Sequence, residues 1–134
     1  MARVLLVEDS GATRAFVRGA LANVEAGDVP LEVVEAESGF EALRLLPRGP
    51  WNLVITDVNM PDINGLELLS FIRSSERHRS TPVLLMSTQT SERDRERGLA
   101  LGAVGYLAKP FSPEQLRDEA LRHLSRAEGE SGHG

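Results

Sequence analysis

Four short apolar runs in this chain each end in a polar or charged side chain. They lead into the carboxylates of Glu8 and Asp9, the carboxylate of Asp57, the hydroxyl of Ser87 and the ammonium group of Lys109. If the runs are neighbouring parallel strands, their carboxyl ends meet at one edge of a sheet, where open α/β folds place their chemistry. Clustered carboxylates beside one ammonium group suit a divalent cation and a phosphoryl group.

Strand and helix patterns alternate five times along the 134 residues. The expected strands are 4–7, 31–34, 53–56, 83–86 and 105–108, and the expected helices are 12–24, 39–46, 65–74, 91–101 and one from 113 onward. Ser10, Ser38, Asn64 and Ser112 stand where helix N-caps are expected. This alternation predicts an α/β fold, a doubly wound parallel sheet of five strands with helices on both faces.

Length and composition predict one domain with its own core, over residues 1–126. Residues 127–134 are rich in Gly, Ser and Glu, which predicts a disordered C-terminal tail. Because this tail is short, we expect a stand-alone module.

A net charge of −5 argues against direct binding to nucleic acid. The apolar runs are far shorter than the roughly 20 residues that span a bilayer, and there is no cysteine, so we expect a cytoplasmic protein without membrane insertion.

Asp57 ends the most apolar of the expected strands, and its carboxylate can attack a phosphoryl donor and hold the group as an acyl phosphate. Because a carboxylate and a phosphate repel each other, the reaction needs a cation, and Glu8, Asp9 and Asp57 would supply hard oxygen ligands for Mg²⁺. Lys109 is the only lysine in the chain, and it would pair with a phosphoryl oxygen. The Ser87 hydroxyl would donate to another. Phosphoryl transfer depends mostly on positioning and charge neutralisation, so these side chains suffice.

These residues, with others that follow them, carry a resemblance to a known family. The further residues are Met60-Pro61, Gly65, Gly102-Ala103, Tyr106 and Pro110-Phe111. Over about Ala2 to Leu124 the chain resembles the receiver domain of bacterial two-component response regulators, most of all the single-domain chemotaxis type. The resemblance implies a flavodoxin-like (βα)5 fold with strand order 2-1-3-4-5.

The resemblance also implies a metal site and a phosphoacceptor. Asp57 would accept a phosphoryl group from a histidine kinase. Asp9, with Glu8 and Asp57, would hold Mg²⁺, and Asn59 would add its backbone carbonyl. The protein would assist only its own phosphorylation and dephosphorylation, so it is not expected to be an enzyme acting on other substrates.

The remaining implied residues form a switch. Ser87 would be the switch hydroxyl, Lys109 the phosphate-pairing ammonium group and Tyr106 the switch aromatic, and the Lys109–Pro110 bond would be cis. Phosphorylation adds roughly −1.5 to −2 charges, which would draw Ser87 and Lys109 inward. Tyr106 would then turn and reshape the face formed by the fourth helix, fifth strand and fifth helix, which a downstream target reads. Tyr106 as half-buried packing without a switching role is the competing interpretation. The module is expected to be a monomer or a weak dimer.

Other functions are compatible with parts of this pattern. A phosphorelay or phosphate-sink receiver would lack a dedicated output. An aspartate-nucleophile phosphatase usually has a second acid two residues after the nucleophile, where this chain has Asn59. A flavodoxin-like nucleotide binder needs a phosphate cradle after the first strand, where Glu8 and Asp9 would repel one. A receiver that binds partners without phosphorylation would not need the acids, the hydroxyl and the lysine that are present here.

Two features depart from the family pattern. Thr88 stands where a small alanine is common, and its extra bulk is expected to hinder access to the site or to alter loop movement. The fourth expected helix has no apolar anchor before Leu99, has Glu96 where the family often has an aliphatic residue, and contains Gly98, which costs about 1 kcal/mol of helix propensity. This helix is either simply solvated, or mobile at rest and ordered by a partner.

Overall fold

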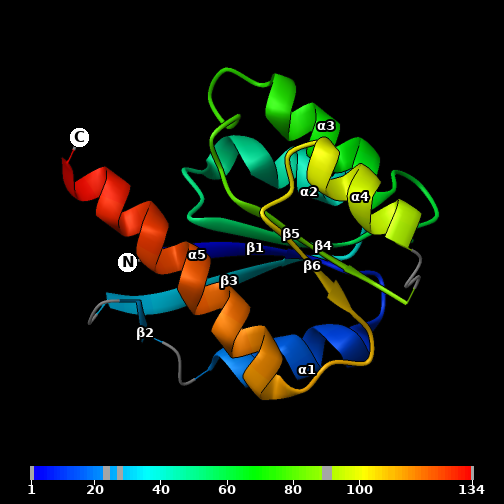
Figure 1. Cartoon of the computed structure of the whole chain (residues 1–134), viewed down its shortest axis with the longest axis horizontal. Coiled ribbons are helices and arrows are strands. Elements are labelled where there is room, and N and C mark those ends of the chain that lie inside the picture. The colour runs from blue at the N-terminus through cyan, green and yellow to red at the C-terminus, as the bar shows by residue number, and fades with distance from the viewer. Residues whose placement is uncertain (1, 23–24, 27–28, 89–91, 134) are drawn as a thin grey trace.

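The computed structural model describes residues 2–22, 25–26, 29–88 and 92–133. Its described strands form one six-stranded sheet in the order β2-β3-β1-β4-β5-β6, with helices on both sides (Figure 1). The strands are β1 Ala2–Val7, β2 Glu25–Ala26, β3 Val29–Ala36, β4 Leu53–Asp57, β5 Val83–Ser87 and β6 Gly105–Ala108. The helices are α1 Gly11–Leu21, α2 Gly39–Leu45, α3 Gly65–Ser74, α4 Glu92–Ala100 and α5 Pro113–His133, with a short 3-10 helix, η1 Leu46–Arg48, after α2.

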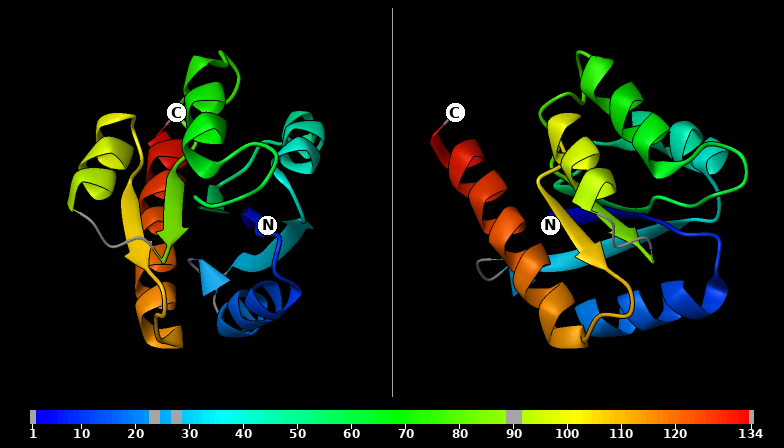
Figure 2. Two further views of the ribbon diagram at one scale, coloured as in Figure 1. Left: turned by 90° about the vertical axis from the view of Figure 1, so that its right-hand side faces the viewer. Right: turned by 45° about the vertical axis from the view of Figure 1, so that its right-hand side comes forward.

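The five parallel strands stand in the order β3-β1-β4-β5-β6, which is the predicted order 2-1-3-4-5. β1 lies between two partners, so that Val4 is in register with Val33 of β3 and with Leu53 of β4. Helices α1 and α5 cover one face of the sheet, and α2, α3 and α4 cover the other (Figure 2). The predicted doubly wound, flavodoxin-like fold is confirmed. The strand order reverses between β1 and β4, and such folds place their ligands at the carboxyl ends of these strands.

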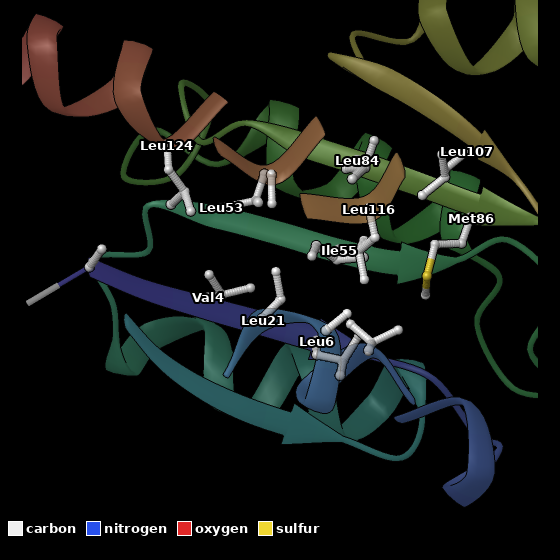
Figure 3. Close-up of a cluster of buried hydrophobic side chains, with 14 residues drawn as sticks. Val4, Leu6, Leu21, Leu53, Ile55, Leu84, Met86, Leu107, Leu116 and Leu124 are labelled. Atoms are coloured by element: carbon white, nitrogen blue, oxygen red, sulfur yellow. The ribbon is translucent and has the colours of Figure 1, made fainter. Parts of the chain in front are cut away.

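Alternate residues of β1 enter two separate cores. Val4 and Leu6 pack beneath α1 and α5, in the cluster drawn in Figure 3. Leu5 and Val7 pack beneath α2 and α3 on the opposite face. All four side chains are fully buried, which explains why the central strands appear in the sequence as continuous apolar runs. Burial on both faces fixes the register of β1, and with it the position of the residues that follow.

Polar side chains begin the helices where the sequence predicts them. Ser10, Ser38 and Asn64 are N-caps whose side chains each accept a hydrogen bond from the backbone N–H three residues later. Ser112 accepts one from Gln115 N–H at 3.1 Å, and the Gln115 side chain accepts one in return from Ser112 N–H at 2.8 Å. These caps fix the start of the helices at the edge of the sheet where β1, β4 and β6 end.

The second predicted strand is longer than the sequence pattern indicates. β3 pairs with all of β1, from Leu31 opposite Ala2 to Ala36 opposite Val7. The short strand β2, which the sequence pattern does not predict, pairs antiparallel with the start of β3. A strand of two residues is too short to show the alternation on which such a prediction relies.

The C-terminal segment differs from the sequence expectation. Helix α5 continues to His133, whereas the sequence predicts a disordered tail over residues 127–134. After Pro113 the helix contains no further proline, and each added residue of a growing helix gains one backbone hydrogen bond. The boundary of the domain at residue 126 stays a prediction.

In the part of the chain that the structure describes, none of the helices is long and apolar enough to cross a membrane.

Arg73, in the last turn of α3, connects loops at the amino ends of β5 and β6. Its guanidinium donates to the carbonyl of Gly102 at 2.6 Å, to that of Thr81 at 2.7 Å and to that of Arg79 at 3.1 Å. Gly102 has a φ of +104°, and a Cβ there would lie 2.7 Å from Arg73 Nε. Burial lowers the pKa of Arg73. This contact fastens the end of α4 to α3.

Candidate functional site

Three carboxylates meet at the carboxyl edge of the sheet. Glu8 and Asp9 follow β1, and Asp57 is the last residue of the neighbouring strand β4. One carboxylate oxygen of each residue lies within 4.8 Å of the others. Glu8 and Asp57 are buried, with 1% and 5% of their surface exposed, and Asp9 is exposed. The strand register therefore brings the predicted acids together.

Lys109 reaches into this cluster from the end of β6. Its ammonium nitrogen lies 2.5 Å from Glu8 Oε1 and 3.4 Å from Asp57 Oδ1. Its backbone N–H donates to the carbonyl of Ser87 at 2.8 Å, and the Lys109–Pro110 bond is cis, as the resemblance implies. The sequence pattern predicts a phosphoryl oxygen as the partner of Lys109 and does not indicate the closer contact with Glu8. This single ammonium group offsets part of the negative charge of the two buried acids.

The Glu8 carboxylate is held at both oxygens. Oε1 contacts Lys109, and Oε2 accepts a hydrogen bond from Ser10 N–H at 3.2 Å. Burial raises the pKa of Glu8, opposed by the hydrogen bonds from Lys109 and Ser10, while Asp9 and Asp57 act in the same direction as burial. A cation in the cluster would favour the charged form of all three acids.

Asn59 links Asp57, the predicted phosphoacceptor, to Ser87, the predicted switch hydroxyl. Its backbone N–H donates to Asp57 Oδ1 at 3.3 Å, and its side-chain amide donates to Ser87 Oγ at 3.3 Å. Ser87 is fully buried at the end of β5, whereas Asn59 is exposed. The family resemblance implies for Asn59 a backbone carbonyl at the metal, and the sequence shows that it replaces the second acid of a phosphatase. No sequence signal indicated the bond to Ser87, because it depends on how the loop after β4 folds back.

Gly65 allows α3 to begin close to Asp57. A Cβ at this position would overlap the backbone oxygen of Asp57 and would lie 2.9 Å from Val58 Cα. The Gly65 N–H donates to the Val58 carbonyl at 2.9 Å. The sequence pattern indicates only a helix-end glycine here, and the structure shows that Gly65 is required by this close approach of two backbones.

Asp62, a fourth acid, lies in the loop between β4 and α3 but takes no part in the acidic cluster. Its carboxylate accepts hydrogen bonds from Phe40 N–H at 2.9 Å and from Gly39 N–H at 3.2 Å, at the start of α2. The Phe40 N–H is the main cause of the lowered pKa of Asp62, with a smaller contribution from Gly39. Asp62 therefore fastens the loop after β4 to α2.

Tyr106 lies half-buried on β6, opposite Leu85 of β5. The neighbouring helix α4 approaches through Gly98, where a Cβ would lie 2.7 Å from Leu85 Cδ1 and 3.7 Å from Tyr106 Cδ2. In the sequence, Gly98 counts only as a cost in helix propensity. In the structure it is buried and allows α4 to pack onto the strand pair that carries Tyr106 and Ser87.

A cavity of about 410 Å³ opens beside Lys109. It is lined by Ala12, Thr13, Phe16, Thr88, Lys109, Pro110 and Phe111. The rings of Phe16 and Phe111 meet edge to face, with their centroids 5.9 Å apart. Thr88 is exposed and lines this cavity together with Lys109.

Comparison with known proteins gives a consistent result. Residues 4–121 match the family described as response regulator receiver domain. A chemotaxis protein CheY homolog of Campylobacter jejuni subsp. jejuni serotype O:2 is 32% identical over 129 residues, which are 96% of each chain.

Two solved structures illustrate the likeness in three dimensions. The chemotaxis protein CheY4 of Vibrio cholerae is 38% identical, with a TM-score of 0.80 over 91% of this chain and 98% of the other. The response regulator Rcp1 in its Mn²⁺-bound form is 26% identical, with a TM-score of 0.76 over 91% of each chain. The sequence match, the fold and the carboxyl-edge cluster agree, and the chain belongs to the response regulator receiver domain family.

Proposed function

We propose that this chain is a phosphorylation-activated signalling switch of a two-component system, and that Asp57 accepts the phosphoryl group. The observation that carries the proposal is the position of the Asp57 carboxylate. It is buried beside two further acids, and the Lys109 ammonium nitrogen lies 3.4 Å from its Oδ1. A nucleophilic carboxylate with a cation at hand is the arrangement that phosphoryl transfer to an acid requires.

The donor in such a system is a phosphorylated histidine of a kinase. An oxygen of the Asp57 carboxylate forms the new bond to phosphorus while the phosphorus–nitrogen bond of the donor breaks. The leaving imidazole nitrogen keeps the bonding electron pair and takes up a proton. Lys109 pairs with the charge on the transferred group. The backbone N–H of Asn59, which donates to Asp57 Oδ1, helps to orient the acceptor carboxylate.

The residues present fit a divalent cation. Three carboxylates within 4.8 Å of one another are the hard oxygen donors that Mg²⁺ prefers, and they are costly to place together without a cation. Asp9, Asp57 and the backbone carbonyl of Asn59 would hold Mg²⁺, with Glu8 beside them. When bound, the metal neutralises charge on the phosphoryl oxygens. The Mn²⁺-bound form of Rcp1, a response regulator of similar fold, supports this assignment.

Phosphorylation then changes the partners of two side chains. Lys109 turns from Glu8 towards the phosphoryl group, and Ser87 exchanges its bond with Asn59 for one with a phosphoryl oxygen. Each charge-assisted hydrogen bond is worth about 1.5–3 kcal/mol, and reversing a two-state equilibrium from 1:99 to 99:1 takes about 5.5 kcal/mol. The two new bonds would supply about 3–6 kcal/mol, less the free energy of the contacts with Glu8 and Asn59 that they replace.

The output follows from the position of these side chains. Movement of Ser87 at the end of β5 alters the space beside Tyr106, and α4 packs on the same strands through Gly98. The face formed by α4, β6 and α5 would then bind a downstream target. A phosphatase function has less support, because the position that would hold its second acid is Asn59, whose amide donates to Ser87. The switch acts in the cytoplasm as a monomer or weak dimer.

The experiment is incubation with Mg²⁺ and acetyl phosphate, followed by intact mass measurement. One base-labile phosphoryl group per chain is expected on the wild type and none on Asp57→Asn. Asp62→Asn is the matched control, because its acid lies in the same loop but faces α2. Chelation of Mg²⁺ should prevent the modification. A wild type that stays unmodified with excess donor would refute the proposal, and rapid turnover of varied phosphate esters would favour a phosphatase.

A further inference from the structure

We infer that Arg14 is a positioning residue for the metal site, which acts by fixing the peptide group that joins Glu8 to Asp9. The inference rests on the proposed function, since it concerns Mg²⁺ affinity at the acidic cluster. Arg14 lies in α1, outside the cluster, and neither the metal nor the phosphoryl group is expected to touch it. Its side chain is only 15% exposed.

The guanidinium group of Arg14 joins the loop after β1 to the end of β3. Nη1 donates to the backbone carbonyl of Glu8 at 2.7 Å. Nε lies 3.3 Å from Glu35 Oε1, and Nη2 lies 3.4 Å from Glu37 Oε1. A planar group with donors in fixed directions is suited to hold three acceptors from two segments at once. The two glutamates thus hold the guanidinium against the Glu8 carbonyl.

The contact with the Glu8 carbonyl matters because of what shares its peptide plane. A peptide group is planar, so the Glu8 carbonyl and the Asp9 N–H turn together. On its other side, Glu8 N–H donates to the carbonyl of Ala36 at 3.0 Å, which continues the β1–β3 ladder. With both backbone groups of Glu8 held, the direction in which the chain enters Asp9 is set. Asp9 is the most exposed acid of the cluster and depends most on this constraint.

Charge alone predicts the opposite effect from positioning. Arg14 is a cation close to a cation site, so its removal should tighten Mg²⁺ binding if only Coulomb energy counts. Partners that orient the ligands of a metal typically change affinity by about 10- to 100-fold when they are removed. The sign of the change in affinity therefore separates the two accounts.

Arg18 supplies a matched control one turn further along α1. Its Nη1 lies 2.7 Å from Glu35 Oε2, so it shares an acidic partner with Arg14. Its side chain is 59% exposed, and this partner belongs to β3, not to the loop after β1. Arg18→Gln removes the same charge from the same helix and leaves the Glu8 carbonyl bonded. Arg14→Lys keeps the charge beside Glu35 and Glu37, but a single ammonium group does not reproduce the planar fork.

The test is calorimetric titration of the unphosphorylated chain and its variants with MgCl₂, after circular dichroism has established that each variant is folded. Arg14→Gln and Arg14→Lys should both bind Mg²⁺ about tenfold more weakly than the wild type. Arg18→Gln should stay within about twofold, as expected for an exposed ion pair. With acetyl phosphate as donor, Arg14→Lys should be phosphorylated more slowly than the wild type at limiting Mg²⁺. Its rate of phosphorylation should approach the wild-type rate when Mg²⁺ saturates the site.

The outcomes separate this inference from the proposed function. If the wild type binds no Mg²⁺, the proposed function fails. If the wild type binds and both Arg14 variants bind equally well or more tightly, only the positioning role of Arg14 is overturned. Should Arg14→Gln not fold, Arg14→Lys alone decides the question, because it keeps a positive charge facing Glu35 and Glu37.

Discussion

Replacing Gly65 by alanine is expected to damage stability and phosphorylation together. The added Cβ would overlap the backbone oxygen of Asp57 and come within 2.9 Å of Val58 Cα. Both contacts are with backbone, so no side chain can rotate away. Overpacking of this kind costs about 1–3 kcal/mol, against which alanine recovers about 1 kcal/mol of helix propensity. Only a shift of α3 or of the loop after Asp57 can relieve the clash. A displacement of about 1 Å at a reacting group costs on the order of 100-fold in rate.

The chain contains a matched glycine for comparison. Gly19 lies in α1, and a Cβ added there would have no atom within 4 Å, so Gly19→Ala should stabilise the protein by about 0.5–1 kcal/mol. Urea unfolding of the three proteins measures the free energies, and acetyl phosphate with intact mass detection measures the rate at Asp57. Gly65→Ala should unfold at lower urea than the wild type and accept the phosphoryl group more slowly. A Gly65→Ala protein with wild-type stability and rate would show that the backbone approach is not required.

Two further predictions concern the loops that hold the site in place. Backbone N–H donors lower the pKa of Asp62, so its charged form is stabilised in the folded state. The stability advantage of the wild type over Asp62→Asn should therefore be full near neutral pH. It should shrink as the pH falls below 3.8, the ordinary pKa of an aspartate. Thermal unfolding of both proteins across pH measures this, and a difference that grows on acidification would contradict it. Arg73→Ala should lower the free energy of unfolding by at least about 2 kcal/mol, because it removes the donor to three carbonyls. Arg79→Ala, at an exposed side chain, should change it by less than about 0.5 kcal/mol in the same urea experiment.

The fold could be predicted from the sequence where local patterns and simple geometry agree. Parallel strands end at a common edge, so the residues after the apolar runs of β1, β4 and β6 were expected at one edge of the sheet once the alternation was recognised. The position of Asp57 near Glu8 and Lys109 follows from that rule together with the strand order that the family resemblance implies. The helix starts at Ser10 and Asn64 were predicted for an equally local reason, the capping of free N–H groups.

The remaining features depend on contacts that no local pattern encodes. The bond from Asn59 to Ser87 and the reach of Arg14 to the Glu8 carbonyl join segments through side-chain conformations that only the folded chain determines. Gly98 looked unfavourable because helix propensity ignores what lies beneath the helix, and here Leu85 lies so close that any larger residue would have to displace its side chain. The strand β2 is too short to produce a pattern, and the extension of α5 to His133 runs against a composition that usually indicates disorder.

The attachment of Arg73 to Gly102 has a consequence for how α4 can move. The C-terminal end of α4 is tied to α3 at the amino edge of the sheet, whereas its first turn lies towards the carboxyl edge, after Ser87. If the hydrogen bonds of Arg73 to Gly102 persist, α4 can therefore move only by rotating about its C-terminal end near Gly102. Small displacements near Ser87 would then swing the first turn of α4 through the largest arc, while its last turn stays in place.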